Sequence, residues 1–354
     1  MKAINKIIKN LWYGNRNLLL RLTKQNLKPR WMWFAVTDKC NSHCTHCHIW
    51  QQKPEENPLT LEELDRFFSD PLLKDIELII NSGGEAIIHP QILELLQLEH
   101  QKFPKAVINI STNAIMADKV LTVTKALLEE KTKLNLGISI DGIGEKHDKI
   151  RGVPGNFQKV DYLTKELIKL QQQYPGLMTI TMGFTLSELT IDNWLEVKEY
   201  CEKLGVEVMA QWYNQSSFYS NEADENKIIQ DRMTEIVKSL PLSTTKERWL
   251  RLLADKSIKF NCFALDTFFA MKCTGEIIPC LTHWDATIGS AKENTFKEIW
   301  TSQKAKNIRK MVAKCPGCLN SWGLNWSLSS AFYPRLAFFL RNPKEIINWL
   351  KTNR

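Results

Sequence analysis

The sequence predicts an α/β protein with a parallel sheet, and three observations support this fold class. Six short apolar runs recur along residues 31–213, amphipathic helical patterns lie between them, and the runs are continuously apolar. Strands joined by helices cross over in the right-handed sense and pair in parallel. Continuously apolar strands are typical of a sheet that is covered on both faces. Six such units form either a partial barrel or an open doubly wound sheet, and the pattern alone does not choose between them.

The expected elements can be placed along the chain. Strands are predicted at residues 31–37, 76–82, 106–112, 134–141, 178–184 and 206–213, and helices at 61–68, 92–100, 120–130, 160–173 and 194–204. Thr60 and Glu63 have the spacing of a capping box, and Gly205 follows the fifth helix as a C-cap glycine. Residues 224–255 have a helical pattern, residues 259–322 are rich in turns and cysteines, and residues 327–354 have a helical pattern broken at Pro343.

The charge of the chain is concentrated at its N-terminus. Residues 1–30 carry eight of the 47 Lys and Arg residues and no Asp or Glu, which leaves 39 basic residues against 39 acidic ones. A neutral body lacks the charge that phosphate binding needs, so no nucleic-acid partner is expected. No apolar run approaches eighteen residues, and the basic segment lacks a signal-peptide cleavage site. These features predict a cytoplasmic protein.

Three of the nine cysteines lie just after the first strand. Cys40, Cys44 and Cys47 fall within eight residues, at the edge of a parallel sheet where active sites form. A reducing compartment favours metal or redox roles over structural disulfides. Three thiolates can hold a four-iron cluster with one iron left open. The alternative is a zinc site completed by a nearby histidine, namely His43, His46 or His48.

This CxxxCxxC spacing, with an aromatic ring at His46, resembles the signature of the radical SAM superfamily. The resemblance continues at the next strand ends, with Ser82-Gly83-Gly84-Glu85, then Ser111-Thr112-Asn113-Ala114, then Ser139-Ile140-Asp141-Gly142 and the following residues 147–152. Ala114 departs from the pattern, since the family commonly has glycine there. The motifs cover most of residues 31–213, and the resemblance implies a partial (β/α)6 barrel.

The resemblance also implies roles for these residues. The three cysteines would ligate a [4Fe–4S] cluster that binds S-adenosylmethionine and, after one-electron reduction, yields a 5′-deoxyadenosyl radical. Gly83 and Gly84 are expected to let the backbone approach the ligand closely, because glycine has no Cβ atom. The expected ligand-binding residues are Gly83, Gly84 and Glu85 for the methionine amino group, Ser139 and Arg151 for the carboxylate, Thr112, Asn113 and Asp141 for the ribose, and the backbone of His46 for the adenine.

A second set of cysteines lies near the C-terminus. Its spacing resembles the auxiliary-cluster domain of SPASM/Twitch radical SAM enzymes, and the shorter Twitch form fits because no cysteine follows residue 318. The resemblance implies one auxiliary iron–sulfur cluster, of the [4Fe–4S] type, although four thiolates also suit structural zinc. We interpret Cys273 as a spare thiol and Cys201 as a buried apolar residue. The expected auxiliary ligands are Cys262, Cys280, Cys315 and Cys318.

Two clusters suggest oxidation of a small polar, sugar-like substrate, with the auxiliary cluster as electron acceptor or substrate anchor. An electron donor such as flavodoxin or ferredoxin is expected. Epimerisation, group transfer or carbon–carbon bond formation on a lipid-linked or peptide substrate is the alternative, and a zinc-stapled binding or scaffold protein is the alternative from another class. The thirty residues before the first strand are too few for a leader-binding domain, which disfavours a peptide. The weaker substrate-facing candidates are Gln211, Tyr213, Asp266, His283 and Asp285.

The expected domain organisation has four parts. Residues 1–30 form a basic amphipathic arm, 31–255 the barrel with its following helices, 256–322 the auxiliary-cluster domain, and 323–354 a basic amphipathic tail. Amphipathic basic helices can lie on anionic membranes, which would give peripheral membrane contact. The alternative is that both ends cover apolar parts of the body.

Overall fold

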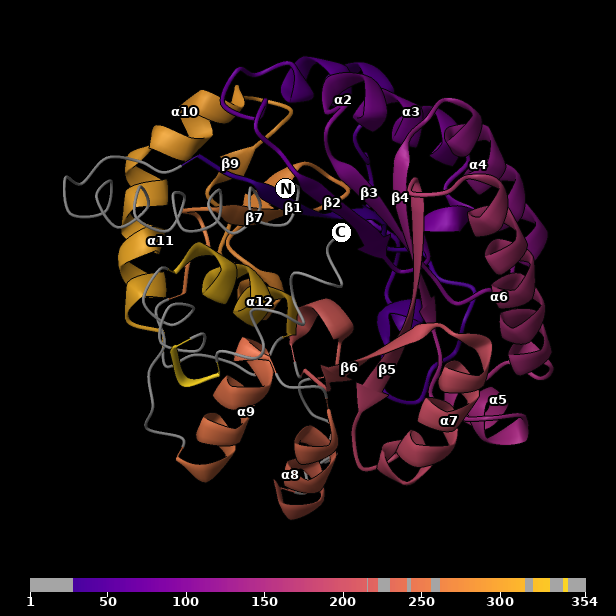
Figure 1. The fold of residues 1–354 in the computed structure, drawn as a ribbon. Coiled ribbons are helices and arrows are strands. Elements are labelled where there is room, and N and C mark those ends of the chain that lie inside the picture. Colours follow the sequence, from indigo (N-terminus) through magenta and orange to yellow (C-terminus); the bar gives the residue numbers. More distant parts are fainter. Residues whose placement is uncertain are drawn as a thin grey trace.

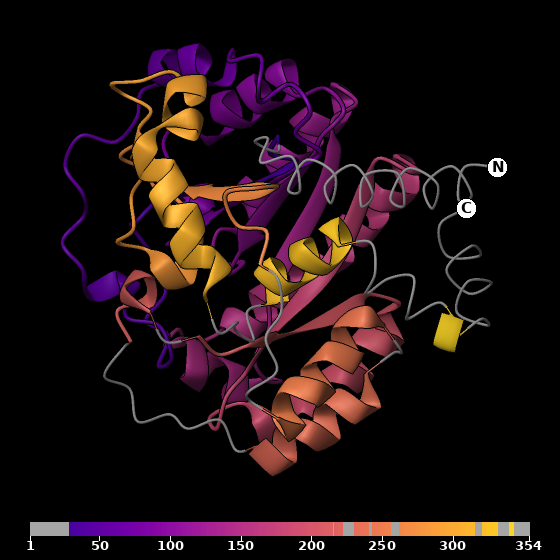
Figure 2. The ribbon, with the colours of Figure 1, turned by 90° about the vertical axis from the view of Figure 1, so that its left-hand side faces the viewer.

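The computed structural model describes residues 28–214, 216–221, 230–240, 243–255, 262–315, 321–331 and 340–342. Within them, one open sheet has nine strands in the order β6-β5-β4-β3-β2-β1-β7-β8-β9. Strands β1 to β6 pair in parallel with their sequence neighbours, and helices lie on the outer side of the curved sheet (Figures 1 and 2). This is the expected partial barrel of six units.

The six parallel strands and their outer helices follow the sequence pattern closely. The strands are β1 (Trp31–Thr37), β2 (Leu78–Gly83), β3 (Val107–Thr112), β4 (Lys133–Ser139), β5 (Met178–Leu186) and β6 (Glu207–Trp212). The helices are α2 (Leu61–Phe68), α3 (Ile92–Lys102), α4 (Ala117–Glu129), α6 (Asn156–Gln173) and α7 (Trp194–Leu204). The capping box of Thr60 and Glu63 is present, and Gly205 has a φ of 68°, so both predicted helix ends are confirmed.

The first strand shows why the sheet needs continuous apolar runs. All seven residues of β1 are buried. Met32 and Phe34 pack into the large core between the strands and the outer helices, whereas Trp31 and Trp33 pack into a second core on the inner side of the barrel. Alternate side chains of a strand point to opposite faces, so a strand that is covered on both faces is apolar at nearly every position.

The C-terminal third continues this sheet. Strand β7 (Phe268–Met271) pairs in parallel with β1, and β8 (Glu276–Ile278) and β9 (Gly289–Ser290) follow as antiparallel strands. Helices α8 (Gln230–Ser239) and α9 (Thr244–Ala254) precede them. Helices α10 (Phe296–Thr301) and α11 (Gln303–Ala313) lie in the segment expected to be rich in turns, and α12 (Ser321–Ser330) follows it.

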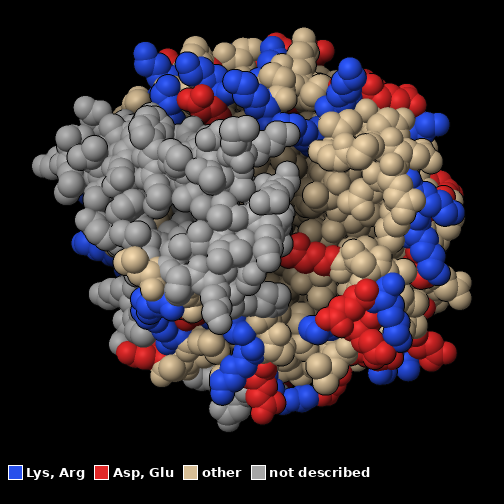
Figure 3. Space-filling model, viewed as in Figure 1, with Lys and Arg blue, Asp and Glu red and all other residues tan. Residues whose placement is uncertain are grey.

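Two expectations need correction. Helices α10 and α11 lie in a segment that was expected to be rich in turns, and residues 147–151, for which no helix was predicted, belong to α5 (Glu145–Arg151). Residues 1–27 of the basic arm and most of the basic tail lie outside the described residues. No helix in the described ranges is long and apolar enough to cross a membrane. On the face in Figure 3, acidic and basic side chains both occur around the described surface.

Candidate active site

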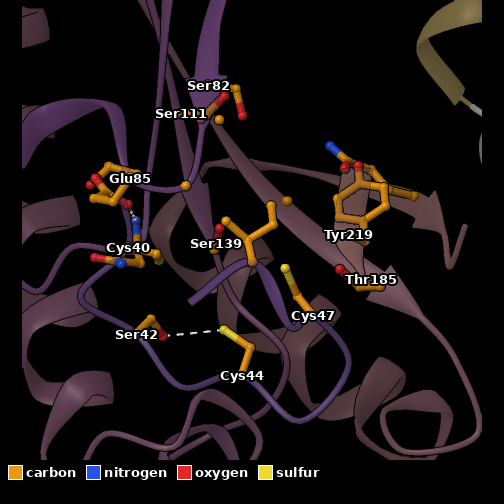
Figure 4. Close-up of a pocket in the computed structure, with 18 of the residues that line it drawn as sticks. Cys40, Ser42, Cys44, Cys47, Ser82, Glu85, Ser111, Ser139, Thr185 and Tyr219 are labelled. Atoms are coloured by element: carbon orange, nitrogen blue, oxygen red, sulfur yellow. Dashed lines mark hydrogen bonds between the residues drawn. The ribbon is translucent and has the colours of Figure 1, made fainter. Parts of the chain in front are cut away.

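A pocket opens at the carboxyl ends of the parallel strands (Figure 4). It is lined by motifs that are far apart in the sequence, from the cysteine loop after β1 to the end of β6. Asp141, Asp266, His283 and Asp285 are not among its lining residues. The predicted residues that line it are Cys40, Cys44, His46, Cys47, Gly83, Gly84, Glu85, Thr112, Asn113, Ser139, Arg151, Gln211 and Tyr213.

The cysteine loop is docked on the C-terminal end of α5. The backbone amide of His43 donates to the carbonyl of Arg151 at 3.1 Å, and that of Thr45 donates to the carbonyl of Ile150 at 2.9 Å. The last carbonyls of a helix have no partner within the helix, so the loop satisfies groups that would otherwise need water. Gly152, with a φ of 65°, permits this contact because a Cβ atom there would overlap the carbonyl of His43.

The Gly-Gly-Glu segment packs against the other side of the same loop. The amide of Gly84 donates to the carbonyl of Thr37 at 2.7 Å, and that of Glu85 donates to the carbonyl of Lys39 at 2.9 Å. A Cβ atom at Gly83 or Gly84 would overlap these carbonyl oxygens. The glycines therefore permit close contact with the segment leading into Cys40. This contact is a reason for glycine in addition to the expected approach to a ligand, since both glycines also line the pocket.

The thiols suit an iron–sulfur centre in chemistry and placement. Burial raises the pKa of Cys40 to about 11 and that of Cys47 to about 12, so iron ligation would displace protons from both. The Cys44 sulfur lies 3.1 Å from the Ser42 hydroxyl (Figure 4). It also lies 3.8 Å from Nη1 of Arg151. Within the described ranges, no three His, Cys, Asp or Glu side chains gather closely enough to hold a single metal ion.

Glu85 offers an open acceptor to the pocket. Its carboxylate is 3% exposed, Oε2 accepts from the amide of Asn113 at 2.8 Å, and Oε1 has no hydrogen-bond partner in the described part of the chain. Burial raises the pKa of Glu85 to about 7, against the opposing hydrogen bonds of Thr112 and Asn113. A buried acceptor without a donor fits an ammonium group supplied by a ligand. Ala114, which follows Asn113 in the sequence, has a φ of 64°. Glycine adopts such a conformation more easily than alanine, which explains why glycine is common at this position.

Arg151 faces the pocket and is held from behind by Asp141. Nη2 of Arg151 lies 2.7 Å from Oδ2 of Asp141, and Oδ1 accepts from the amide of Thr185 at 3.0 Å. Burial alone would raise the pKa of Asp141, but Arg151, His46, the amide of Thr185 and His147 together outweigh burial, and the pKa is lowered. Asp141 has no exposed surface, and it does not line the pocket. This geometry does not fit the expected ribose contact, and Asp141 instead orients Arg151.

Asn221 was not found from the sequence. Its buried side chain donates to the carbonyl of His46 at 3.2 Å and to that of Asn214 at 3.0 Å, and accepts from the amide of Ser216 at 3.0 Å. It thereby ties the segment after β6 to the cysteine loop at His46, whose backbone was expected to face the adenine. Asn221 lies in a polar stretch without periodicity, so no sequence signal marks it.

The described auxiliary cysteines lie at the inner core. Cys262 and Cys280 pack against the same apolar cluster, which contains Trp33 and Phe218. Cys315 lies beside His283 and forms a hydrogen bond with it. This hydrogen bond raises the pKa of His283, although burial opposes the shift. Cys318 lies outside the described residues.

The remaining candidates have other neighbours. Asp285 accepts from the Ser217 hydroxyl at 2.8 Å, and Asp266 lies 3.9 Å from Nε of Arg309. Cys201 is fully buried, as predicted. Cys273 is 6% exposed, and burial raises its pKa to about 12.

Comparisons with known proteins agree with this site. Residues 34–197 match the model of the radical SAM superfamily, and residues 262–319 match the SPASM iron–sulfur cluster-binding domain. The Fe-coproporphyrin III synthase of Methanosarcina barkeri is 34% identical over 140 residues, which are 39% of this chain and about a third (33%) of that protein's length. The AdoMet-dependent heme synthase of the same organism is 21% identical over 321 residues, covering 82% of this chain and 88% of that protein.

A solved structure shares the fold. The crystal structure of Streptococcus suis SuiB has a TM-score of 0.62 at 16% identity and covers 84% of this chain and 71% of that one. The family models assign a [4Fe–4S] cluster and S-adenosylmethionine to the barrel and iron–sulfur binding to the C-terminal region. The thiols, the open Glu85 acceptor and the nearby Arg151 fit these groups. The chain is therefore a member of the radical SAM superfamily with a C-terminal SPASM iron–sulfur domain.

Proposed function

We propose that this radical SAM enzyme oxidises a small, uncharged, hydroxyl-bearing substrate. The observation that carries the proposal is the meeting, in one pocket, of three thiols, the open acceptor of Glu85, the cation of Arg151 and a wall of hydroxyl groups. When bound, the cluster and S-adenosylmethionine would supply radical chemistry that removes a hydrogen atom from the substrate, and the auxiliary cysteines would hold a cluster that accepts the remaining electron as a proton leaves to solvent.

The residues at and just beyond the carboxyl ends of the strands would hold the cluster and S-adenosylmethionine. Cys40, Cys44 and Cys47 would hold the cluster. Glu85 would accept the methionine ammonium at its open oxygen, and Arg151 would donate to the carboxylate with charge-assisted hydrogen bonds. The other residues proposed to contact S-adenosylmethionine are Ser139 at the carboxylate, Thr112 and Asn113 at the ribose, and the backbone of His46 at the adenine.

The strand registers supply a second layer for the substrate. Gly137 of β4 is paired with Ser111 of β3 on one side and with Thr181 of β5 on the other, so the three form one row across the sheet. All three line the pocket, and so does Ser82. Gly137 has no side chain between two hydroxyl-bearing neighbours, which leaves space where the substrate could contact them. Hydroxyl groups both donate and accept, as a polyol substrate requires.

The charges of the lining favour a neutral substrate over a polyanion. Among the described lining residues, Glu85 and Arg151 alone carry a formal charge, and Arg151 is already paired with Asp141. Relatives of this chain include proteins named Probable GTP 3′,8-cyclase and AdoMet-dependent heme synthase. A triphosphate or a set of carboxylates is usually bound by several cations. The described lining supports an uncharged substrate instead.

Aromatic side chains connect the pocket with the auxiliary cysteines. Phe218 lines the pocket, and its ring centroid lies 5.1 Å from that of Trp33 and 4.5 Å from that of Trp284. Trp284 follows Cys280 by four residues, and Leu281 also lines the pocket. The auxiliary cysteines thus begin close to the substrate space, which supports a role for their cluster as electron acceptor or substrate anchor. The first electron would come from a donor such as flavodoxin or ferredoxin, in the reducing cytoplasm.

Reductive cleavage of S-adenosylmethionine tests the radical chemistry. The reconstituted enzyme, reduced with dithionite without oxygen, should form 5′-deoxyadenosine. The triple substitution Cys40→Ala, Cys44→Ala and Cys47→Ala should abolish it, whereas Cys201→Ala should not, because Cys201 lies in the outer core. Formation of 5′-deoxyadenosine by the triple variant would refute the assignment.

Gly137→Ala tests the substrate layer. An added Cβ meets nothing closer than 3.4 Å, so the fold should tolerate it while the pocket narrows. Small-molecule extract of the native host, separated into neutral, anionic and peptide fractions, should stimulate 5′-deoxyadenosine formation only through the neutral fraction. Gly137→Ala should lose this stimulation and keep the basal cleavage. Stimulation by the anionic or the peptide fraction, or by none, would contradict a neutral polyol substrate.

A further inference from the structure

Glu85 and Arg151, the two charged residues of the described pocket lining, are joined through the protein by a network of one ion pair and four hydrogen bonds with His147 at its centre. We propose that His147 is a positioning residue that fixes the separation of Glu85 and Arg151, and thereby the affinity for the amino-acid part of S-adenosylmethionine. The inference rests on the proposed binding of that ligand. His147 itself has no exposed surface and does not line the pocket, so it acts through other residues.

One half of the network runs from His147 to Arg151. The backbone amide of Asp141 donates to Nδ1 of His147 at 3.1 Å, and the carboxylate of Asp141 lies 2.7 Å from Nη2 of Arg151. The imidazole therefore holds the backbone of the residue that orients the guanidinium. Displacement of Asp141 would move the cation that is proposed to bind the carboxylate of the ligand.

The other half runs from His147 to Glu85. Nε2 of His147 lies 3.0 Å from Oδ1 of Asn156, whose Nδ2 donates to the carbonyl of Asn113 at 2.9 Å. The amide of Asn113 donates to Oε2 of Glu85 at 2.8 Å. Asn156 is also fully buried. This half fixes the one oxygen of Glu85 that is occupied and leaves Oε1 toward the ammonium.

The geometry assigns the protonation of the imidazole. A backbone amide can only donate, so Nδ1 is the acceptor and the proton of the neutral ring is on Nε2, where it is donated to Asn156. Burial, reinforced by Arg151, lowers the pKa of His147 to about 4, which is consistent with a neutral ring. Every donor in the network then points from Arg151 toward Glu85. Loss of the imidazole would release the backbone of Asp141 on one side and the side chain of Asn156 on the other, so both ends would lose a support.

Two conservative substitutions of His147 each remove one of its two hydrogen bonds and keep the other. His147→Asn places an amide oxygen near the position of Nδ1 and keeps the acceptor for Asp141, but loses the donor to Asn156. His147→Gln places an amide nitrogen near Nε2 and keeps that donor, but loses the acceptor. His147→Ala removes both. The matched control is His100→Asn, since His100 lies on α3 and is not one of the residues that connect Arg151 with Glu85.

The binding probes are S-adenosylmethionine and 5′-methylthioadenosine, which has the same nucleoside but no amino-acid part. With the reconstituted enzyme, His147→Ala should weaken S-adenosylmethionine binding by about tenfold or more, as expected for lost buried hydrogen bonds. His147→Asn and His147→Gln should have intermediate effects, and methylthioadenosine binding should stay within about twofold in all three. The control should bind both probes like the wild type.

A second measurement does not depend on a folded variant. Nitrogen NMR of the folded wild-type protein labelled with [15N]histidine should show His147 as a neutral ring in the Nε2–H form, and the variants serve only to assign its signals. An Nδ1–H form at His147, unchanged S-adenosylmethionine affinity in His147→Ala, or equal loss of both probes would overturn the inference. If the wild type fails to cleave S-adenosylmethionine, the proposed function fails instead, and the tautomer still reports on the network.

Discussion

Gly84 lies against Lys39 so closely that a Cβ atom at position 84 would overlap the Lys39 carbonyl oxygen. The same carbonyl accepts a hydrogen bond from the amide of Glu85 at 2.9 Å. Lys39 immediately precedes Cys40, and Glu85 immediately follows Gly84. The position of the first cysteine and that of the buried carboxylate are therefore set by one backbone-to-backbone contact that only glycine permits.

Gly84→Ala should consequently disturb the cysteine loop. Overlap with a backbone atom cannot be relieved by a rotamer change, so we expect a loss of stability on the order of 3 kcal/mol and reduced cluster content. Iron and sulfide analysis after reconstitution, together with urea denaturation, would measure both. Gly137→Ala is the matched control, because its nearest contact is 3.4 Å away. Full iron content and unchanged stability in Gly84→Ala would refute this reading of the loop.

Asp141→Asn should destabilise the protein strongly. The substitution leaves the guanidinium of Arg151, which is 8% exposed, without its negative partner. Removing one partner of a buried ion pair costs about 3–5 kcal/mol. Glu196→Gln breaks the exposed pair with Lys146 and should cost less than about 1 kcal/mol. Urea denaturation of both variants at neutral pH would show whether the costs differ; equal costs would mean that Asp141 does not support Arg151.

Glu99 should make stability depend on pH. Its fully buried carboxyl accepts from Nδ2 of Asn81 at 2.8 Å, and burial raises its pKa from 4.5 to about 8. Between these two values the folded protein keeps a proton that the unfolded chain has lost, so stability should fall as the pH rises from 4.5 to about 8.

Glu99→Gln removes this titration and should reduce the fall in stability across that window; the fall that remains below a pH of about 7 is expected from Glu85. Thermal unfolding at several pH values would test it, with Glu94→Gln on the exposed face of α3 as the control. A variant whose pH dependence still matched that of the wild type would show that Glu99 is not the responsible group.

Asn221→Ala should loosen the segment after β6. Three buried backbone groups lose their partner at once, and each unsatisfied group costs about 1–3 kcal/mol unless water replaces the contact. We expect lower thermal stability and weaker binding of 5′-methylthioadenosine, because the carbonyl of His46 is released. Asn214→Ala is the control, since Asn214 takes part only through its backbone carbonyl. Wild-type stability and nucleoside binding in Asn221→Ala would contradict this role.

The sequence was informative where the pattern is local. The six apolar residues of β1 that precede Thr37 and the capping box at Thr60 predicted a strand and the start of a helix at the observed residues. Cys40, Cys44 and Cys47 were found because their spacing is short, and the pocket residues were found because each motif ends a strand. The parallel fold itself brings those strand ends together.

The features that depend on distant contacts were missed. Helix α5 has the sequence EKHDKIR, which is too short and too polar to show periodicity. Asp141 looked like a ligand-binding group because the sequence does not reveal that Arg151, ten residues later, would pair with it. The row of Ser111, Gly137 and Thr181 depends on strand register, which is set by packing across the whole sheet.

The parallel pairing of β7 with β1 has a consequence for the assembly of the chain. Strand β1 is completed on one side by residues 268–271, which are synthesised more than two hundred positions later. Until then the nascent barrel exposes a long apolar edge, a template for intermolecular aggregation. A fragment that stops before β7 should therefore be poorly soluble. The region with the auxiliary cysteines should likewise not fold as a separate domain, because β7 belongs to the same sheet as β1.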